Sequence, residues 1–280
     1  EFWPSLLNMH PSQDCPQGGV NIVSTILPDL VPILLENMVY SDMDYAAMDP
    51  SMIDDDNANV PDSLEDIKPR FHESRNRDFE SEDGDDAGGG TTWGSDWTVR
   101  KAAANGLDHI AGHFGESILD HVKPLIEAKL DNKDWQVQES AVLALGAIGH
   151  GTMTGLAKQG LLERILQLLL NKCEHPKPLL RSISCWCVSR FSAWIVHSDK
   201  REVVLKHVLA RLLTAVLDRN KRVQEAGCSA FATLEEAARG YLVPFLPDIV
   251  PALVRAFDYY QAKNLLILYD AVGTLADSVG

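Results

Sequence analysis

Residues 221–234 read KRVQEAGCSAFATL, and their apolar side chains fall three or four positions apart. At this spacing Val223, Ala230 and Phe231 share one side of a helix, and small Gly227 lies between them. Similar segments recur at intervals of 38, 43, 43 and 42 residues, aligned on the anchor residues Val99, Val137, Leu180, Val223 and Leu265. Each anchor is expected to open a helix of about five turns. A helix pair at this period is typical of HEAT and armadillo repeats.

Second helices are expected between the anchors, most of them marked by proline. They are predicted around residues 122–126, 161–170, 203–217 and 241–247. An earlier helix is expected at about residues 22–38, with Pro28 and Pro32 near its start. No stretch shows the alternation of a strand. The sequence therefore predicts an all-α fold, a right-handed α-solenoid of HEAT repeats.

The negative charge of the chain is concentrated in one segment. The formal net charge is −15, and residues 42–96 hold 17 acidic and 4 basic side chains, which is 13 of those charges. This segment has few apolar residues to offset the entropy of ordering, so we expect a long acidic, disordered loop inserted in one repeat. The predicted division is residues 1–45 for the end of one repeat and the first helix of the loop-bearing repeat, 46–95 for the loop, and 96–280 for the second helix of that repeat and about four further repeats.

Charge and motif content narrow the functional classes. Binding to DNA or to an anionic membrane needs clustered Lys and Arg, so direct nucleic-acid and membrane partners are not expected, whereas basic protein partners are. The five Cys include no CxxC pair, and no ligand-spaced His follows Cys185 and Cys187, so no metal or cofactor is expected. No nucleophile with a paired base stands out, so no catalytic residue is predicted and we do not expect an enzyme. Without a signal peptide or an apolar run near 18 residues, the chain is expected to be intracellular and soluble, and its ends suggest an internal part of a longer protein.

Each anchored helix has a second face that the core does not require. In a stacked solenoid one such face lines the concave surface. Taken singly, its acidic residues are more often solvated charges, and its Trp could be an ordinary packed side chain. Together, exposed Leu, Ile and Trp beside isolated carboxylates are typical of a peptide-binding wall. On this face lie Asp108, Leu143, Ile183, Trp186, Arg190, Glu225, Thr233, Glu236, Ile267, Asp270, Thr274 and Asp277.

Several stretches resemble the transportin (karyopherin-β2) branch of the β-karyopherin, or importin-β, family. They are VPDSLEDIKPRFH at 60–72, RSISCW at 181–186, SAFATLEE at 229–236, and KNLLILYD at 263–270 running on to Gly280. The resemblance implies a nuclear import receptor that shuttles between cytoplasm and nucleus. Its cargo, often RNA-binding proteins, would carry signals ending in Arg-x(2–5)-Pro-Tyr. Ran-GTP would release the cargo through the acidic loop, nuclear pore proteins would be further partners, and the receptor would be a monomer.

The resemblance also implies roles for individual residues. The Pro-Tyr pocket would be lined by Asp108, Leu143, Ile183 and Trp186, with Arg190 against the signal backbone. The signal's Arg would meet Thr233, Glu236, Asp270 and Thr274. The preceding signal residues would follow a path lined by Glu225, Ala226, Ile267 and Asp277. Asn105 stands where the family has Ala, which leaves the preference for Tyr open.

Two other interpretations stay open. A structural scaffold of HEAT repeats would contact its partners through loops between repeats and would give the Trp186 face no role. Another β-karyopherin with a different cargo class would prefer, for example, lysine-rich signals. A panel of Pro-Tyr and lysine-rich peptides would discriminate among these interpretations.

Overall fold

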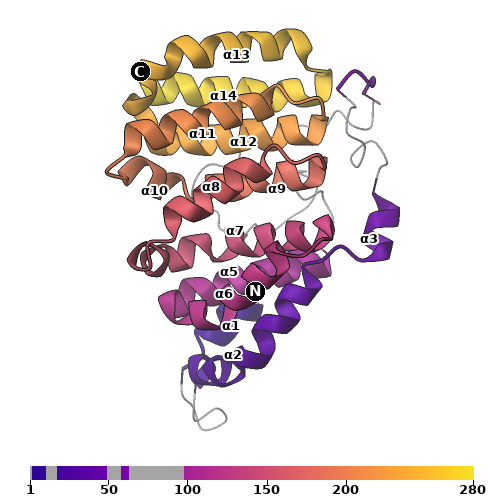
Figure 1. Ribbon diagram of the computed structural model, residues 1–280, viewed down its shortest axis with the longest axis vertical. Coiled ribbons are helices and arrows are strands. Elements are labelled where there is room, and N and C mark those ends of the chain that lie inside the picture. The colour runs from indigo at the N-terminus through magenta and orange to yellow at the C-terminus, as the bar shows by residue number, and fades with distance from the viewer. Residues whose placement is uncertain (1, 11–17, 49–57, 63–97) are drawn as a thin grey trace. The chain divides into compact units, whose positions relative to one another are not determined.

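The computed structural model describes residues 2–10, 18–48, 58–62 and 98–280, and every regular element within these ranges is a helix (Figure 1). Before the insertion lie α1 (Phe2–Leu7), α2 (Gly18–Asn37) and α3 (Asp42–Ala47). After it come α5 (Val99–Phe114), η2 (Gly115–Ile118), α6 (Leu119–Leu130), α7 (Trp135–Lys158), α8 (Leu162–Lys172), α9 (Pro178–Ser189), α10 (Ser192–His197), α11 (Arg201–Val216), α12 (Lys221–Ala238), η3 (Arg239–Phe245), α13 (Leu246–Tyr259) and α14 (Ala262–Val279). The expected all-α fold of HEAT repeats is confirmed.

The chain forms two compact units, and each is described by itself. The first unit contains residues 1–46 and 97–165, and the second contains residues 47–96 and 166–280. The division expected at residues 45 and 95 stays a prediction, because most of the insertion lies outside the described residues. The expected disorder of the acidic loop concerns these same residues and therefore lies outside the described ranges. Cys15 lies outside them as well.

Helix pairs build both units. In the first, α5 packs against α2 and α7, and α6 packs against α7. In the second, α12 packs against α9, α11 and α14, and Figure 1 shows α11–α12 and α13–α14 as successive layers. The glycine at position 227 permits the close approach of α12 to α11, because a Cβ there would lie 2.8 Å from the backbone of Ala215 and Val216. The sequence pattern had placed a small residue at this crossing.

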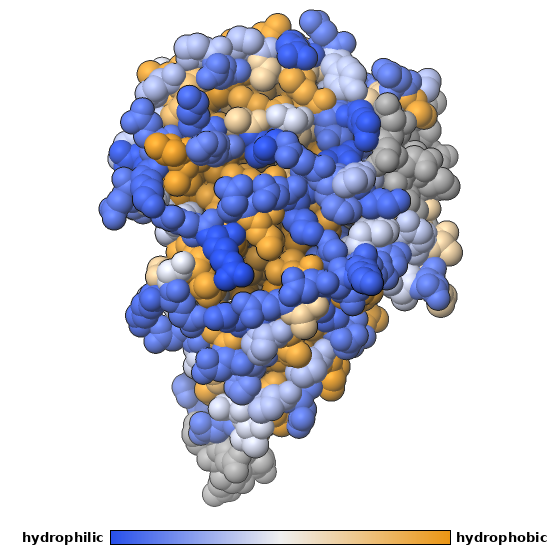
Figure 2. Space-filling view, viewed as in Figure 1, coloured by the Kyte–Doolittle hydropathy of each residue, from blue (hydrophilic) through white to orange (hydrophobic). Residues whose placement is uncertain are grey.

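The two helices of a pair differ in how much of their surface is covered. Thirteen of the eighteen residues of α12 are buried, against three of fourteen in α13. Hydrophobic atoms reach the surface over α13 among hydrophilic ones (Figure 2), and Val250 and Val254 of this helix are 47% and 56% exposed. The anchored helix α12 is thus an inner element of the second unit, enclosed on nearly all sides.

Two of the five predicted anchors are wrong by one residue. Val99 is 69% exposed, while Arg100 beside it is 4% exposed. In α14 the buried residues follow Asn264, which is 2% exposed, and not Leu265, so Tyr269 is 61% exposed although its spacing predicted a core position. In both helices a polar residue occupies the buried anchor position. A pattern that counts apolar residues passes over such a side chain.

The helix predicted from Leu180 is shorter than expected. The structure ends α9 at Ser189, caps it with Arg190, and begins the separate short helix α10 at Ser192. Phe191, between them, is 2% exposed. The break turns this ring into the core, and α10 then packs against α11 and α12.

Other boundaries shift more modestly. Helix α2 begins at Gly18, with Pro28 and Pro32 inside it, where burial of side chains such as Val31 and Leu35 offsets the two missing N–H donors. The stretch expected as a helix at 241–247 is mainly the 3₁₀ segment η3, because Pro244 lies within it and Pro247 instead starts α13.

Within the described part of the chain, three stretches are long and apolar enough to span a membrane on length and composition alone, which differs from the sequence expectation. They are Gly18–Ala46, Trp135–Lys158 and Lys221–Tyr259. The first and third each contain more than one helix. In the second, 72% of the apolar window is buried inside the protein, so packing against neighbouring helices accounts for the apolar side chains of α7.

Candidate functional site

The thirteen residues predicted to bind a peptide are divided between the two units. Asp108 on α5 and Leu143 on α7 belong to the first. The second unit carries Ile183 and Trp186 on α9 with Arg190 at its end, Glu225, Ala226, Thr233 and Glu236 on α12, and Ile267, Asp270, Thr274 and Asp277 on α14. Because the units are described separately, one site containing all thirteen residues stays a prediction.

Trp186 is the half-buried aromatic residue of α9. Its neighbours Cys185 and Cys187 are fully buried, so the indole lies where the helix surface meets the core. The guanidinium carbon of Arg190 lies 5.9 Å from the centre of the Trp186 ring, within the range of a cation–π contact. Arg190 holds this place as the cap of α9, where its N–H bonds the carbonyls of Trp186 and Cys187. Together they offer a flat ring beside a cation.

The predicted exposure of the apolar residues is wrong. Leu143 is 0% exposed, Ile183 3% and Ile267 5%. Ala226, assigned through the resemblance, is also buried at 2%. Helix α7 packs against α5 and α6, and α14 packs against α12 and α13, so side chains beside the core stripe are enclosed as well. All four side chains are enclosed in the described structure, and their contact with a peptide stays a prediction.

The corrected anchor in α14 brings its polar residues into the register of α12. Thr233 and Glu236 follow Val223 by ten and thirteen positions, and Thr274 and Asp277 follow Asn264 by the same intervals. Both threonines donate their hydroxyl to the carbonyl four residues earlier, at 3.0 Å each, Thr233 to Ser229 and Thr274 to Asp270. The two helices therefore present matching polar positions, as successive repeats should.

Glu235 is a member of this polar region that the sequence analysis missed. Its side chain is 0% exposed, and neither carboxylate oxygen has a hydrogen-bond partner among the described residues. Burial, together with the smaller effect of the negative charges of Glu236 and Asp270, raises its pKa to about 9. Two adjacent helices thus gather three carboxyl groups, one of which is held protonated at neutral pH. The sequence did contain a signal for the burial of Glu235, because this residue follows the core residue Phe231 by four positions and so lies on the same side of the helix.

The remaining predicted acids differ in exposure. Glu225 is 9% exposed and Glu236 is 7% exposed. Asp108 and Asp270 are half-buried, whereas Asp277 is exposed. Asn105, the departure from the family pattern, is half-buried on α5, and its side-chain oxygen is buried without a hydrogen-bond partner among the described residues. An unsatisfied amide oxygen is costly to bury, so this position is able to accept a donor.

The cysteines of the described chain are enclosed. Cys173, Cys185, Cys187 and Cys228 are buried and free of disulfides. Burial raises the pKa of the Cys187 thiol and brings the pKa of the Cys228 thiol to about 12, so neither is a ready nucleophile. Within the described ranges, no group of three His, Cys, Asp or Glu side chains is arranged to hold a metal ion.

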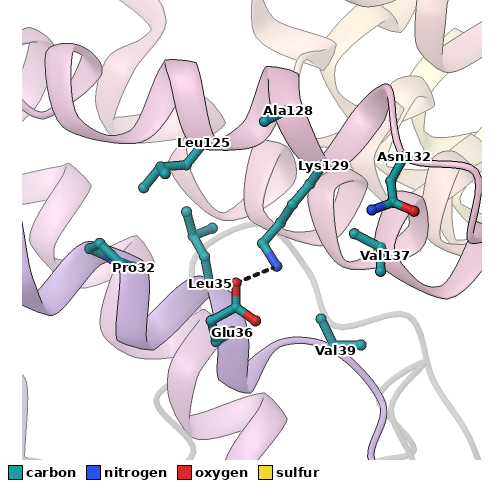
Figure 3. A pocket seen from close by; sticks show the side chains of 9 residues that line it. All are labelled: Pro32, Leu35, Glu36, Val39, Leu125, Ala128, Lys129, Asn132 and Val137. Carbon is teal, nitrogen blue, oxygen red and sulfur yellow. Dashed lines mark ion pairs between the residues drawn. The ribbon is translucent and has the colours of Figure 1, made fainter.

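A pocket of the first unit lies between α2, α6 and the start of α7, away from the predicted residues. Lys129 and Glu36 form an ion pair at 3.1 Å across it (Figure 3). Its walls are mostly apolar, and it is lined by Pro32, Leu35, Glu36, Val39, Leu125, Ala128, Lys129, Asn132 and Val137. None of the thirteen predicted residues contributes to it.

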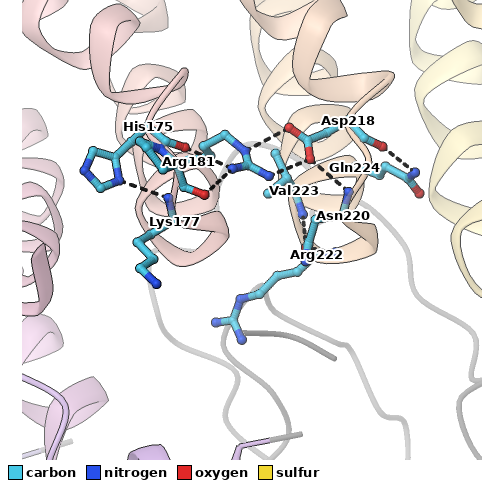
Figure 4. A network of polar contacts seen from close by, with 9 residues as sticks. His175, Lys177, Arg181, Asp218, Asn220, Arg222, Val223 and Gln224 are labelled. Carbon is cyan, nitrogen blue, oxygen red and sulfur yellow. Dashed lines mark hydrogen bonds and ion pairs between the residues drawn. The ribbon is translucent and has the colours of Figure 1, made fainter. Parts of the chain in front are cut away.

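A polar network fixes the turn between α11 and α12 (Figure 4). Arg181 of α9 donates two hydrogen bonds of 2.9 Å to the carboxylate of Asp218. Asn220 caps α12 by accepting from the N–H groups of Arg222 and Val223. Gln224 donates to the carbonyl of Asp218 at 2.7 Å. Bidentate pairing and capping together hold the start of α12 in place.

Comparisons with known proteins agree with the repeat architecture. The HEAT-like repeat family matches residues 135–191. Among curated relatives, Transportin-1 of Mus musculus is 43% identical over 288 residues, which cover all of this chain and 31% of the relative. Transportin-1 of Oryza sativa is 43% identical, covering 100% of this chain and 30% of the relative. Importin subunit beta-2 of Schizosaccharomyces pombe is 39% identical, covering 91% and 30%.

A solved structure gives the same fold. Yeast importin-beta (Kap95p) superposes with a TM-score of 0.66 at 18% identity, covering 97% of this chain and 26% of that one. At this identity the likeness concerns the fold alone. The chain spans about a third of the length of the curated relatives it matches. By its sequence along its whole length, the chain belongs to the transportin group of the β-karyopherin family.

Proposed function

We propose that this chain is the part of a nuclear import receptor that binds the Arg and Pro-Tyr elements of a cargo's nuclear localisation signal. The class of function is supported by relatives named Transportin-1 and Importin subunit beta-2, which match 100% and 91% of the chain. A receptor of this class passes between cytoplasm and nucleus. The chemistry is reversible peptide binding without a catalytic step.

The observation that carries the proposed specificity is the acidic region of α12 and α14. Glu235, Glu236 and Asp270 lie close enough for their charges to influence one another. A guanidinium group between such carboxylates would form charge-assisted hydrogen bonds and would remove their mutual repulsion. Thr233 and Thr274 flank the acids at matching positions of the two helices, and their hydroxyl oxygens retain acceptor capacity.

The Pro-Tyr element is assigned to Trp186 and its surroundings. A half-buried indole offers a flat apolar surface to a proline ring. Arg190 beside it carries donors suited to the carbonyls of an extended peptide. The buried Ile183 and, in the first unit, Leu143 would meet a tyrosine ring only if small shifts of the helices uncover them. Side-chain rearrangement at an interface is common on binding.

The test is fluorescence anisotropy of a labelled Arg-x(4)-Pro-Tyr peptide with the full chain. We expect Pro-Tyr→Ala-Ala in the peptide, or Trp186→Ala in the protein, to weaken binding by about tenfold or more, about 1.4 kcal/mol. Trp194→Ala is the matched control, because Trp194 is another half-buried tryptophan, on α10. Circular dichroism confirms that each variant is folded.

Two outcomes would contradict the proposal. Folded protein that does not distinguish the two peptides would favour a HEAT-repeat scaffold. Tighter binding of a lysine-rich peptide than of the Pro-Tyr peptide would favour a β-karyopherin with another cargo class.

Release by Ran-GTP through the acidic insertion is a further part of the proposal. In a solved structure that resembles this chain in fold, Kap95p binds RanGDP. A tethered polyanion competes with other ligands of a cation-binding surface at high effective concentration. The measurement compares the rate at which cargo dissociates from the full-length receptor with residues 46–95 present and with these residues deleted. Ran-GTP is added in both cases. Equal off-rates would remove the role of the insertion.

A further inference from the structure

The short described part of the insertion, residues 58–62, lies against the second unit. The N–H of Ala58 donates to the carbonyl of Arg219 at 2.9 Å, and Ala58 is 1% exposed. The ammonium of Lys221 bonds both the carbonyl of Val60 and the carboxylate of Asp62. The other carboxylate oxygen of Asp62 accepts from the backbone N–H of Lys263 at 2.6 Å. One aspartate thus joins the starts of two helices.

For α14 this contact replaces a missing cap. Its N-cap residue, Gln261, makes no side-chain hydrogen bond to the helix, whereas α12 is capped by its own Asn220. The first N–H groups of a helix need an acceptor, and carboxylates are favoured at this end by the helix dipole. Asp62 supplies the acceptor from a position 201 residues earlier in the chain.

For α12 the same contact neutralises an unfavourable charge. Lys221 is the first residue of this helix, where a cation opposes the helix dipole. Its side chain is 11% exposed, and that of Asp62 is 5% exposed. Such a pair is screened little by salt, and losing one partner leaves the other charge enclosed. The turn before Lys221 is itself held by the Arg181–Asp218 pair, so the contact of Asp62 is made to a part of the chain with its own polar network.

We propose that residues 58–62 are a built-in clamp that fastens the insertion to the amino-terminal ends of α12 and α14, with Asp62 as its anchor. These are the two helices that carry Glu235, Glu236 and Asp270. Because coupling is reciprocal, any partner that pulls this segment away weakens the start of both helices by the free energy that the clamp contributes. The clamp does not depend on the proposed function, and its test does not use a cargo peptide.

The test is amide hydrogen exchange on the full chain at neutral pH. In Asp62→Ala we expect the Lys263 amide to exchange at least tenfold faster, because its acceptor is gone. Asp62→Asn keeps an acceptor oxygen and loses the charge. The exchange rate of the Lys263 amide in this variant should lie between the rates in the unaltered protein and in Asp62→Ala. Asp258→Ala, at an exposed aspartate of α13, is the control and should leave the Lys263 amide unchanged.

A second variant approaches the clamp from the other side. Lys221→Met keeps the aliphatic chain and removes the ammonium group, so the Ala58 amide should exchange at least tenfold faster. The effects of Lys221→Met and Asp62→Ala on exchange should be less than additive, because they break the same contact. Exchange at Lys263 and Ala58 that stays within twofold of the unaltered protein in both single variants would overturn the clamp.

Discussion

Two buried glutamates, one in each unit, differ in what surrounds them. Glu139 of α7 is 1% exposed and accepts a hydrogen bond of 2.6 Å from Arg100. Glu235 of α12 is 0% exposed, has no hydrogen-bond partner among the described residues, and lies near two further acids. The first glutamate is therefore paired with a cation of its own chain. The second is kept neutral by a proton.

This contrast separates a glutamate paired within the fold from one that is proposed to meet a ligand. Arg100 also bonds the carbonyl of Met38 and lies over the ring of Tyr40, 3.9 Å from its centre, so it joins α5 to α7 and to the segment after α2. Among the described residues, the carboxylate of Glu235 has no such hydrogen-bonded framework. Carboxyl groups with strongly perturbed pKa values and nearby charges are common at functional sites. In the proposed site of the second unit, the guanidinium of a ligand would pair with the carboxylates, as the guanidinium of Arg100 pairs with Glu139 in the first unit.

The largest effect is expected where the ion pair of the first unit is broken. Arg100→Ala should lower the free energy of unfolding by about 3–5 kcal/mol, because Glu139 would be left buried without its cation. Lys158→Ala removes a pair with Glu116 in which both side chains are more than half exposed, and should cost at most about 1 kcal/mol. Urea unfolding followed by circular dichroism measures both. Equal losses would mean that Glu139 does not rely on Arg100.

A smaller effect, dependent on pH, is expected at Glu235. The folded pKa of about 9 lies above the ordinary value of 4.5, so the folded protein keeps a proton that the unfolded chain loses. Stability is therefore full below about pH 4.5 and falls as the pH rises toward 9, by about 1.4 kcal/mol for each pH unit contributed by this group. Glu235→Gln removes this slope.

The measurement is urea unfolding of both proteins at pH 6 and pH 8. From pH 6 to pH 8, the free energy of unfolding of Glu235→Gln should rise relative to that of the unaltered protein by about 3 kcal/mol. Glu236→Gln is the control with a similar change of charge at the neighbouring position. Parallel pH profiles of Glu235→Gln and the unaltered protein would show that Glu235 is ionised in the folded state.

A still smaller change in the free energy of unfolding is expected at Asn264, the polar anchor of α14. Asn264 donates hydrogen bonds to the carbonyl of Lys221 at 2.7 Å and to the side chain of Gln224 at 2.9 Å. Asn264→Ala should cost about 1–3 kcal/mol, because buried groups of α12 lose their donor. Leu265→Ala, at the anchor that the sequence predicted, should cost less, since Leu265 is only half-buried. A larger loss of stability in Leu265→Ala than in Asn264→Ala would show that Leu265, as the sequence predicted, is the anchor of α14.

The smallest effect is expected at the start of α5. Val99→Ala should change the free energy of unfolding by at most about 0.5 kcal/mol, because Val99 is 69% exposed. The neighbouring cap is worth more: Thr98 accepts from the N–H of Lys101, and Thr98→Ala should cost about 1 kcal/mol. Thermal unfolding of the two variants gives their order. A loss at Val99 as large as that at Thr98 would contradict the exposed placement.

Periodicity was enough to predict the fold and the order of the helix pairs. It could not place the anchors Arg100 and Asn264, because a buried polar residue whose partners are distant in the chain looks in the sequence like a surface residue. It also could not predict the end of α9, which depends on the burial of the Phe191 ring against helices distant in sequence.

The candidate site was predictable in part. Spacing selected polar positions that recur in α12 and α14, and the family resemblance assigned roles to them. Exposure was not predictable for Leu143, Ile183 and Ile267, because it depends on how closely neighbouring inner helices pack. Glu235 was missed for the opposite reason, since a charge on the core side of a helix becomes informative only when its burial is known.

The most direct measurement is the number of protons released when a cationic signal peptide binds. Isothermal titration calorimetry of the full chain with an Arg-x(4)-Pro-Tyr peptide at pH 7.5, in two buffers of different ionisation enthalpy, gives this number. We predict release of a substantial fraction of one proton, because a guanidinium near Glu235 lowers its pKa. A peptide with neutral citrulline in place of Arg, and the Glu235→Gln variant, should release none. Tight, arginine-dependent binding without proton release would contradict a site built around Glu235.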